Sequence, residues 1–313
     1  MIDPQLQPFL ADWARLWAEL PQPASPADRR RHFERVAERM RQPTPPGVRA
    51  DEQHRVAVAA GRSVRVLVFR PGAVRPRAAL IYMHGGAWTQ GSPETHWDIT
   101  ARLAAACEMV VISVDFALAP EHPFPAAVDD CRAVVRWAFG EAAALGLRRD
   151  AIAVGGDSAG ANLAAAMTLA FRGAQQTLRA QLLVYPGMDF SHDRPSHREN
   201  PDGPIVTVAT MPAVDAAYCP DPRDRRNPLA APLLAASHTG LPPAFVAVAE
   251  HDPLRDSGIA YADALRAAGV PVVLDRGQGL IHSYLRAMPY CAAARHAFDR
   301  MAAWLREVCA AQR

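Results

Sequence analysis

A serine stands between two glycines at Gly156-Asp157-Ser158-Ala159-Gly160. The apolar run 151–154 leads into this segment, and an alanine-rich helical pattern follows it. The order predicts a tight strand-to-helix turn, in which the glycines permit a strained backbone that lifts the serine hydroxyl away from the chain. Ser158 is therefore the candidate nucleophile.

A histidine and two glycines lie upstream of this serine, in the segment His84-Gly85-Gly86-Ala87-Trp88. The segment comes directly after the apolar run 78–83. Paired glycines allow a loop to turn its backbone N–H groups toward a small anion. We therefore predict an oxyanion hole formed by the N–H groups of Gly85 and Gly86 with that of Ala159.

A nucleophilic serine needs a base and an acid that orients the base. Asp252 lies just past the strand-like run 244–249, where a parallel sheet presents reactive groups. The same residue is also a good helix N-cap, with Pro253 at the first helical position, and the two roles are compatible. Asp256, one turn later, is an alternative acid, but the helix dipole by itself explains a carboxylate there. We predict Asp252 as the acid.

The predicted base is His282. Of the eleven histidines, it alone lies in a loop after the last predicted strand, the position that suits the base. His251 is excluded, because a neighbour of Asp252 in sequence would point away from the acid that it must contact. Such a triad attacks an acyl carbonyl without a metal or an organic cofactor, so we expect neither.

Together these residues resemble the hormone-sensitive-lipase-like carboxylesterases of the α/β-hydrolase superfamily. The resemblance extends from about Ala78 to Met288 through four ordered segments: HGGAW at 84–88, Leu118–Ala127, Gly156–Gly160 and Glu250–Asp256. It implies an α/β-hydrolase fold and a serine esterase that hydrolyses short- to medium-chain carboxylic esters through an acyl-enzyme. It assigns catalysis to Ser158, Asp252 and His282, and the oxyanion hole to Gly85, Gly86 and Ala159. We expect Ala87, Trp88 and Tyr284 to contact the substrate, with Trp88 mainly a packing residue.

The sequence departs from the family pattern at positions that concern the substrate rather than the reaction. Ala87 replaces a third glycine, Ala161 a second glycine after the serine motif, Phe116-Ala117 a Tyr-Arg pair, and Ser283-Tyr284 a Gly-Phe pair. The methyl group of Ala87 adds bulk near the acyl pocket. The H-G-G-x-W form also resembles that of arylformamidases, so amide hydrolysis by the same triad is the alternative function. A non-catalytic binder, like the plant gibberellin receptors that lack the histidine, is disfavoured because His282 is present.

The composition excludes other chemistries. All 34 basic residues are arginine, which excludes a P-loop lysine, a lysine Schiff base and a Ser-Lys dyad. With 32 acidic residues the net charge is +2, and no long basic run predicts a nucleic-acid partner. The densest basic cluster, Arg29-Arg30-Arg31, is interpreted as a solvated helix face. Five cysteines without C-x-x-C spacing argue against a disulfide framework or a zinc site.

The chain start carries no signal-peptide pattern, and no apolar run approaches the roughly 18 residues of a membrane span. We therefore expect a cytoplasmic protein with a small-molecule ester substrate and no membrane partner.

Strand and helix patterns alternate along most of the 313 residues. After a hairpin of 54–60 and 63–69, strands are expected at about 79–84, 109–114, 151–155, 180–185, 244–249 and 271–275. This alternation predicts a mainly parallel central sheet flanked by helices, an α/β fold. Val272–Leu274 is expected at an exposed sheet edge, where a second copy would pair to give a homodimer.

Two segments depart from the alternation and are expected to form a helical cap on the catalytic domain, residues 51–313. Residues 1–50 form the N-terminal cap segment: apolar side chains recur at helical spacing from Leu6 to Leu20, and a second helix spans about 27–41. These helices pack on the body, form part of a lid over the active site, or do both. The other segment, an insertion at about 187–224, is rich in Pro, Asp and His.

Within that insertion, several apolar side chains are expected to line the substrate entrance: Met188, Phe190, Ile205, Val206 and Tyr218. Its acidic and histidine side chains, Asp189, His192, Asp193 and His197, fit no standard metal spacing. In the 118–127 region, Asp115, Glu121 and His122 are interpreted as hydrogen-bonding groups that fix the loop.

Overall fold

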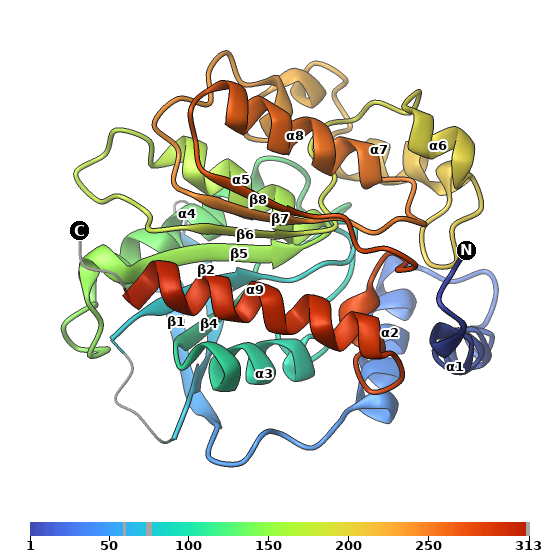
Figure 1. The fold of residues 1–313 in the computed structure, drawn as a ribbon, viewed down its shortest axis with the longest axis horizontal. Helices are drawn as coiled ribbons and strands as arrows, with labels where there is room; N and C mark the ends of the chain where they lie inside the picture. Colours follow the sequence, from blue (N-terminus) through green and yellow to red (C-terminus); the bar gives the residue numbers. More distant parts are fainter. Residues whose placement is uncertain (59–60, 73–76, 311–313) are drawn as a thin grey trace.

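The computed structural model describes residues 1–58, 61–72 and 77–310. These residues form an eight-stranded sheet with the strand order β1-β2-β4-β3-β5-β6-β7-β8 (Figure 1). The strands are β1 Arg49–Ala57, β2 Ser63–Arg70, β3 Ala79–Met83, β4 Val110–Asp115, β5 Ile152–Asp157, β6 Gln181–Val184, β7 Ala244–Ala247 and β8 Val272–Asp275. All pairs from β4 to β8 are parallel, whereas β1 and β2 are antiparallel additions at one edge.

The six predicted core strands all form, each within two residues of its expected bounds. The hairpin is also confirmed, although its first strand begins earlier than expected, at Arg49. Residues 59–60, predicted as the end of that strand, lie outside the described residues. The mainly parallel α/β sheet is therefore confirmed, and it aligns the carboxyl ends of its strands at one edge.

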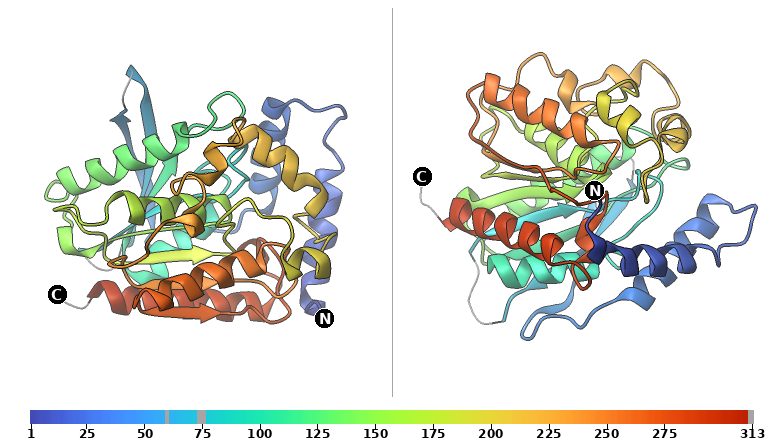
Figure 2. Two further views of the ribbon diagram at one scale, coloured as in Figure 1. Left: turned by 90° about the horizontal axis from the view of Figure 1, so that it is seen from above. Right: turned by 45° about the vertical axis from the view of Figure 1, so that its right-hand side comes forward.

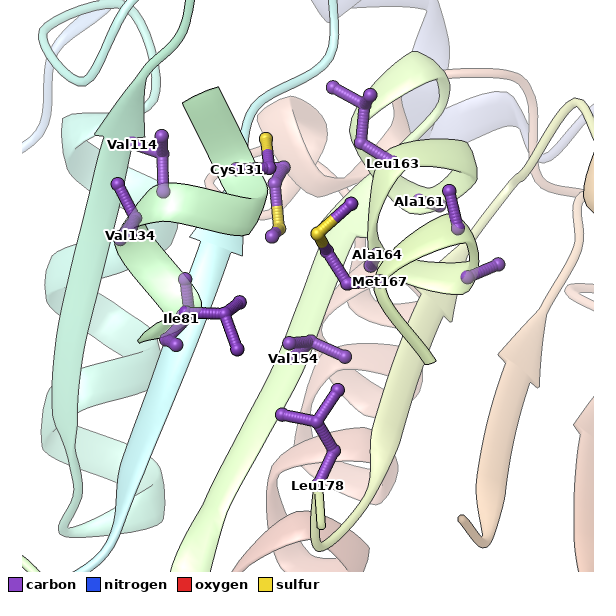
Figure 3. Packing of buried hydrophobic residues seen from close by; sticks show 14 of the residues in the cluster. Ile81, Val114, Cys131, Val134, Val154, Ala161, Leu163, Ala164, Met167 and Leu178 are labelled. Carbon is purple, nitrogen blue, oxygen red and sulfur yellow. The ribbon is translucent and has the colours of Figure 1, made fainter. Parts of the chain in front are cut away.

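Helices lie on both faces of the sheet and at the ends of its strands. The α-helices of the described residues are α1 Gln7–Trp17, α2 Pro26–Met40, α3 Trp97–Cys107, α4 Ala126–Gly140, α5 Ala159–Ala170, α6 Pro195–Glu199, α7 Met211–Tyr218, α8 Arg255–Ala267 and α9 Ala292–Ala310. In Figure 1, α3 and α9 lie on one face and α4, α5 and α8 on the other. Figure 3 shows the packing between α4, α5 and the sheet, where Val134 and Met167 meet Ile81 and Val154. The alanines of α5 are buried, so this helix sits close to the strands that carry its N-terminal turn.

The N-terminal helices α1 and α2 lie at the end of the molecule where the parallel strands finish, as do α6 and α7 (Figures 1 and 2). Of the predicted apolar positions in α1, Phe9 and Leu16 are buried. Helix α2 starts at a capping box in which Ser25 and Asp28 bond each other's backbone N–H groups.

The expectation that Arg29–Arg31 form a solvated face is wrong for Arg30. Its guanidinium turns inward and donates to the carbonyl oxygens of Thr89 (2.8 Å) and Ala119 (2.7 Å) and to the Glu121 carboxylate. Consecutive helical residues point about 100° apart, so three cannot share one face. Helix α2 is thus bonded to the loops after β3 and β4.

Two of the three groups predicted to fix the 118–127 region form ion pairs, one within that region and one at the end of β4. Glu121 pairs with Arg30, and Asp115 accepts from Arg65 Nε at 2.8 Å. The side chain of His122 has no hydrogen-bond partner among the described residues.

The insertion is anchored by residues next to the strand ends. The side-chain amide of Asn162, in the first turn of α5, donates to the carbonyl oxygens of Gly187 (2.9 Å) and Ala230 (3.0 Å), near the two ends of the segment. Ser196 in α6 donates its hydroxyl to the Pro253 carbonyl at 2.6 Å. Two of its polar groups lie close together, with His192 Nε2 2.8 Å from Asp215 Oδ2. Within residues 1–58, 61–72 and 77–310, no group of three or more His, Cys, Asp or Glu could hold a metal ion.

Strand β8 occupies the edge of the sheet, as predicted, and the Val273 side chain is exposed there. Pairing of this edge with a second copy stays a prediction.

The five cysteines are buried free thiols. In the part of the chain that the structure describes, no helix combines the length and the apolar character needed to cross a membrane.

The turn after β5 packs directly on the end of β3, with no side chain between the two backbones. A Cβ atom at Gly156 or Gly160 would overlap the carbonyl oxygen of Met83. Both glycines of the serine motif are therefore required for this close approach as well as for the turn.

We expect Gly160→Ala to lower the free energy of unfolding by about 2 kcal/mol, because overlap with the Met83 carbonyl outweighs the better helix propensity of alanine. Gly140→Ala, in the last turn of α4 where a Cβ would meet nothing within 4 Å, is the matched control and should be neutral or slightly stabilising. Urea unfolding measures both. Equal effects at the two positions would contradict the proposed close contact.

Candidate active site

Ser158 occupies the turn between β5 and α5. Its backbone has φ 53° and ψ −120°, a region that costs a residue with a side chain about 1–3 kcal/mol. The Ser158 N–H donates to the Val184 carbonyl of β6 at 2.8 Å, which holds the strained turn in place. The residue stays partly exposed, so its hydroxyl is accessible at the carboxyl edge of the sheet.

The loops after β7 and β8 bring Asp252 and His282 together. An isolated parallel bridge pairs His251 with Ile281, and the His251 N–H donates to the Leu280 carbonyl at 2.9 Å. Asp252 and His282, the residues that follow this bridge on the two loops, are therefore placed side by side. His282 Nδ1 lies 2.7 Å from Asp252 Oδ2, and His282 Nε2 lies 3.0 Å from Ser158 Oγ.

The acid and the base are both enclosed by protein. Asp252 has no exposed surface and His282 is 3% exposed. The carboxylate of Asp252 also accepts the Leu254 N–H at 2.9 Å. The N-cap role weighed for Asp252 is wrong, because α8 begins at Arg255 and Leu254 is its N-cap, so Pro253 precedes the helix. A carboxylate in this position fixes the imidazole with its proton on Nδ1, which leaves Nε2 free to accept the serine proton.

Asp256, the alternative acid, lies away from the histidine. Its carboxylate accepts the Ser196 N–H of α6 at 2.7 Å and Arg255 Nε at 2.9 Å. It therefore anchors the insertion. His251, excluded on sequence grounds, places its Nε2 3.7 Å from Glu250 Oε2.

The prediction that Gly85 is an oxyanion donor is not compatible with the structure. Its N–H is buried and already donates to Asp157 Oδ1 at 3.0 Å. The N–H groups of the next two residues, Gly86 and Ala87, have no acceptor among the described residues, and both residues are partly exposed. Ala159 N–H is at the first turn of α5 and is likewise without an acceptor there. The open amides of this region thus include those of Gly86, Ala87 and Ala159.

A buried polar cluster lies behind the serine. Tyr82 Oη donates to Asp157 Oδ1 at 2.7 Å, and Tyr185 Oη lies 3.4 Å from Asp157 Oδ2. The Tyr185 ring also contacts His282, with ring centroids 4.7 Å apart. Burial by itself would raise the pKa of Asp157, but the facing His96 and Arg286 and the Tyr82 hydroxyl outweigh it and hold this pKa below its ordinary value. Asp157 is therefore a carboxylate that ties the serine turn to the loop after β3.

His84 is part of the support for the same loop. Its Nδ1 lies 2.9 Å from the Gly85 carbonyl, and its ring stacks on Phe116 with centroids 4.2 Å apart. Burial, assisted by the neighbouring His96, lowers the pKa of His84 to about 3. The ring is therefore neutral and holds the loop by packing and by its Nδ1–H bond.

Two predicted substrate-binding side chains lie deeper than expected. Tyr284 has no exposed surface and packs on Tyr185 with centroids 5.2 Å apart, so it supports the ring that contacts His282 instead of facing a substrate. Trp88 is 8% exposed and stacks in parallel on Tyr218 of α7, at 4.2 Å. Phe190 lies 6.2 Å from Trp88. The loop after β3 and the insertion thus share an aromatic cluster, made of Trp88, Tyr218 and Phe190.

Sequence reasoning missed the supporting residues Tyr82, His96, Tyr185 and Arg286. Tyr82 and Tyr185 lie in or beside apolar strands, where an aromatic ring is indistinguishable from a core residue. The signal that could have found Tyr82 is a hydroxyl inside a fully buried strand, because such a group needs a partner.

Comparison with known proteins agrees with this geometry. Residues 80–286 match a protein family described by the alpha/beta hydrolase fold. The chain is 40% identical to carboxylesterase NlhH of Mycobacterium tuberculosis over 76% of each chain, and 42% identical to an arylesterase of Saccharolobus solfataricus over 66% of this chain and 68% of the other. The solved structure of a hyperthermophilic esterase from the archaeon Pyrobaculum calidifontis superposes with a TM-score of 0.89 at 33% identity, covering 99% of both chains.

The strain at Ser158 yields a prediction about stability. Ser158→Gly and Ser158→Ala both remove the hydroxyl, but only glycine adopts φ 53° at little cost. We expect the glycine variant to have a free energy of unfolding about 1 kcal/mol greater than the alanine variant, measured by urea unfolding. An alanine variant that is the more stable of the two would argue against a strained serine turn.

Proposed function

The chain belongs to the hormone-sensitive-lipase-like carboxylesterases of the α/β-hydrolase superfamily and hydrolyses carboxylic esters, and we propose that Ser158, His282 and Asp252 carry out this reaction. The observation that supports the assignment most directly is the continuous chain of contacts from Ser158 Oγ through His282 to Asp252, at 3.0 and 2.7 Å. These separations suit proton transfer between neighbours.

The reaction follows from these contacts. His282 Nε2 takes the proton of Ser158 as Oγ attacks the ester carbonyl, while Asp252 stabilises the imidazolium that forms. The tetrahedral intermediate collapses as His282 protonates the leaving alcohol, which leaves an acyl-enzyme on Ser158. Water, deprotonated by the same histidine, then attacks the acyl group and releases the acid.

The oxyanion of that intermediate is proposed to bind the open amides of Gly86, Ala87 and Ala159. This assignment replaces Gly85 by Ala87, because the Gly85 N–H is committed to Asp157. Each such donor contributes about 3 kcal/mol in comparable sites. The positive φ of Ala87, 54°, is consistent with a loop turned to present successive amides.

The domain division is proposed to follow the sequence expectation, with residues 1–50 and the insertion at about 187–224 as a two-part cap over the body at 51–313. Support comes from the placement of α1, α2, α6 and α7 beside the carboxyl edge of the sheet. The aromatic cluster of Trp88, Tyr218 and Phe190 adjoins the proposed oxyanion amides and limits the space there. This favours esters of short to medium acyl length, and the name of the Saccharolobus relative supports aryl esters as test substrates.

We expect nitrophenyl esters of two to eight acyl carbons to be hydrolysed, with kcat/KM falling for longer chains. In Ser158→Ala, kcat should fall by roughly 10³-fold or more, since the nucleophile is lost. An N-formyl aryl amide in the same assay tests the amide alternative. Faster turnover of the amide than of every ester would favour the amidase, and undiminished activity in the alanine variant would contradict the serine assignment.

A second experiment separates the two candidate acids. Asp252→Asn should lower kcat by about 10³- to 10⁴-fold, because the imidazole loses the partner that fixes its tautomer. Asp256→Asn is the matched control and should retain kcat within a few-fold, since Asp256 bonds α6 and not the histidine. Similar losses in both variants would show that the carboxylates act through the fold and not through His282.

A further inference from the structure

An arginine four residues after the base lies between the N-terminal helices and the cluster behind the serine. Arg286 Nη1 donates to the Thr95 carbonyl at 2.8 Å, and its Nη2 lies 2.9 Å from His96 Nε2. The guanidinium also lies over the ring of Phe33 in α2, 4.8 Å from its centroid. None of these contacts belongs to the proposed catalytic triad.

Arg286 lies against the imidazole of His96. Its Nη2 is 2.9 Å from Nε2 and 3.4 Å from Nδ1, so it contacts the ring without lying along the lone pair of either nitrogen. On the other side of the ring, Nδ1 lies 2.9 Å from Thr95 Oγ1. Burial above all, and also the charge of Arg286, lower the pKa of His96. Arg286 is therefore the permanent positive charge of this group.

His96 lies between this charge and the serine turn. Its Nε2 lies 3.5 Å from Asp157 Oδ2, and His96 and Asp157 are both almost completely buried. A buried carboxylate is costly unless a positive charge and hydrogen bonds compensate it. The other carboxylate oxygen holds the Gly85 N–H at 3.0 Å, directly before the proposed oxyanion amides.

We propose that Arg286 is a positioning residue for ester hydrolysis, acting through His96 and Asp157 to hold the loop that carries the amides of Gly86 and Ala87. The inference rests on the proposed function, because it concerns the oxyanion hole of the same site. Without the guanidinium, Asp157 loses its compensating charge, and its bond to the Gly85 N–H weakens. The oxyanion amides then lose their fixed orientation.

The arrangement also connects α1 and α2 to the chemistry. Phe33 packs on the guanidinium and, with centroids 6.2 Å apart, on the edge of the His96 ring. Trp13 of α1 has its ring centroid 6.0 Å from the same guanidinium carbon. The N-terminal helices therefore help to hold Arg286 in the position from which it compensates Asp157.

The test compares Arg286→Met with Arg41→Met on nitrophenyl butyrate, with Ser158→Ala in parallel. Arg41 is the matched control, since it also donates to a loop carbonyl, that of Glu94 at 3.0 Å, and stacks on an aromatic ring, Trp97 at 5.1 Å. Arg286→Met should lower kcat by roughly 10- to 100-fold with KM within about twofold, because a small displacement of an oxyanion donor affects the transition state more than substrate binding. Arg41→Met should keep kcat within about twofold.

Native kcat in Arg286→Met, or an equal loss in both variants, would overturn the inference. If Arg286→Met does not fold, Arg286→Lys tests the inference in its place. The lysine ammonium lacks the planar fork that reaches both the Thr95 carbonyl and His96, so kcat should fall at least about threefold. Native kcat in the lysine variant would then overturn it. Full activity in Ser158→Ala would overturn both the proposed function and this inference. If Ser158→Ala is inactive and Arg286→Met is fully active, only the inference is overturned.

Discussion

The carboxylate of Asp157 joins the two halves of the active site. It is nearly fully buried at the end of β5, one residue before the nucleophile, and it holds the Gly85 N–H of the loop after β3. The backbones of those two segments also touch, because Gly156 and Gly160 leave no side chain between the serine turn and the Met83 carbonyl. The distance from the serine to the oxyanion amides is therefore fixed by a rigid junction. Such preorganised donors stabilise charge without rearranging during the reaction.

The other half of the chemistry depends on strand register. β7 and β8 are adjacent and parallel, and an isolated bridge between His251 and Ile281 pairs the loops that follow these strands. This bridge places Asp252 next to His282, whose imidazole faces the serine that follows β5. Backbone pairing between the two loops thus fixes the positions of Asp252 and His282, as pairing between strands would. The Tyr185 ring, which contacts both His282 and Tyr284, supports the imidazole from the side of β6.

The helices outside the sheet are bonded to the same loops that carry the chemistry. Arg30 of α2 holds the Thr89 carbonyl just after the oxyanion segment, and Asn162 beside the serine holds both ends of the insertion. The use of arginine for every basic residue contributes here, because a planar guanidinium group can bond two acceptors at once. Arg30 bonds two carbonyl oxygens in this way, and Arg286 contacts both the Thr95 carbonyl and His96.

Sequence alone was sufficient for the parallel α/β sheet, its six core strands, and the three residues now seen in contact, because motifs placed after strands must meet at one edge of such a sheet. It could not decide which N–H groups of the glycine loop stay open, since that depends on whether Asp157 reaches Gly85 from another strand. Nor could it tell that Tyr284 is enclosed, that Arg30 turns inward, or that Arg286 faces His96. Local pattern fixes where a residue lies on its own element, whereas hydrogen-bond partners and burial come from elements far away in the chain, and only the packed structure brings those together.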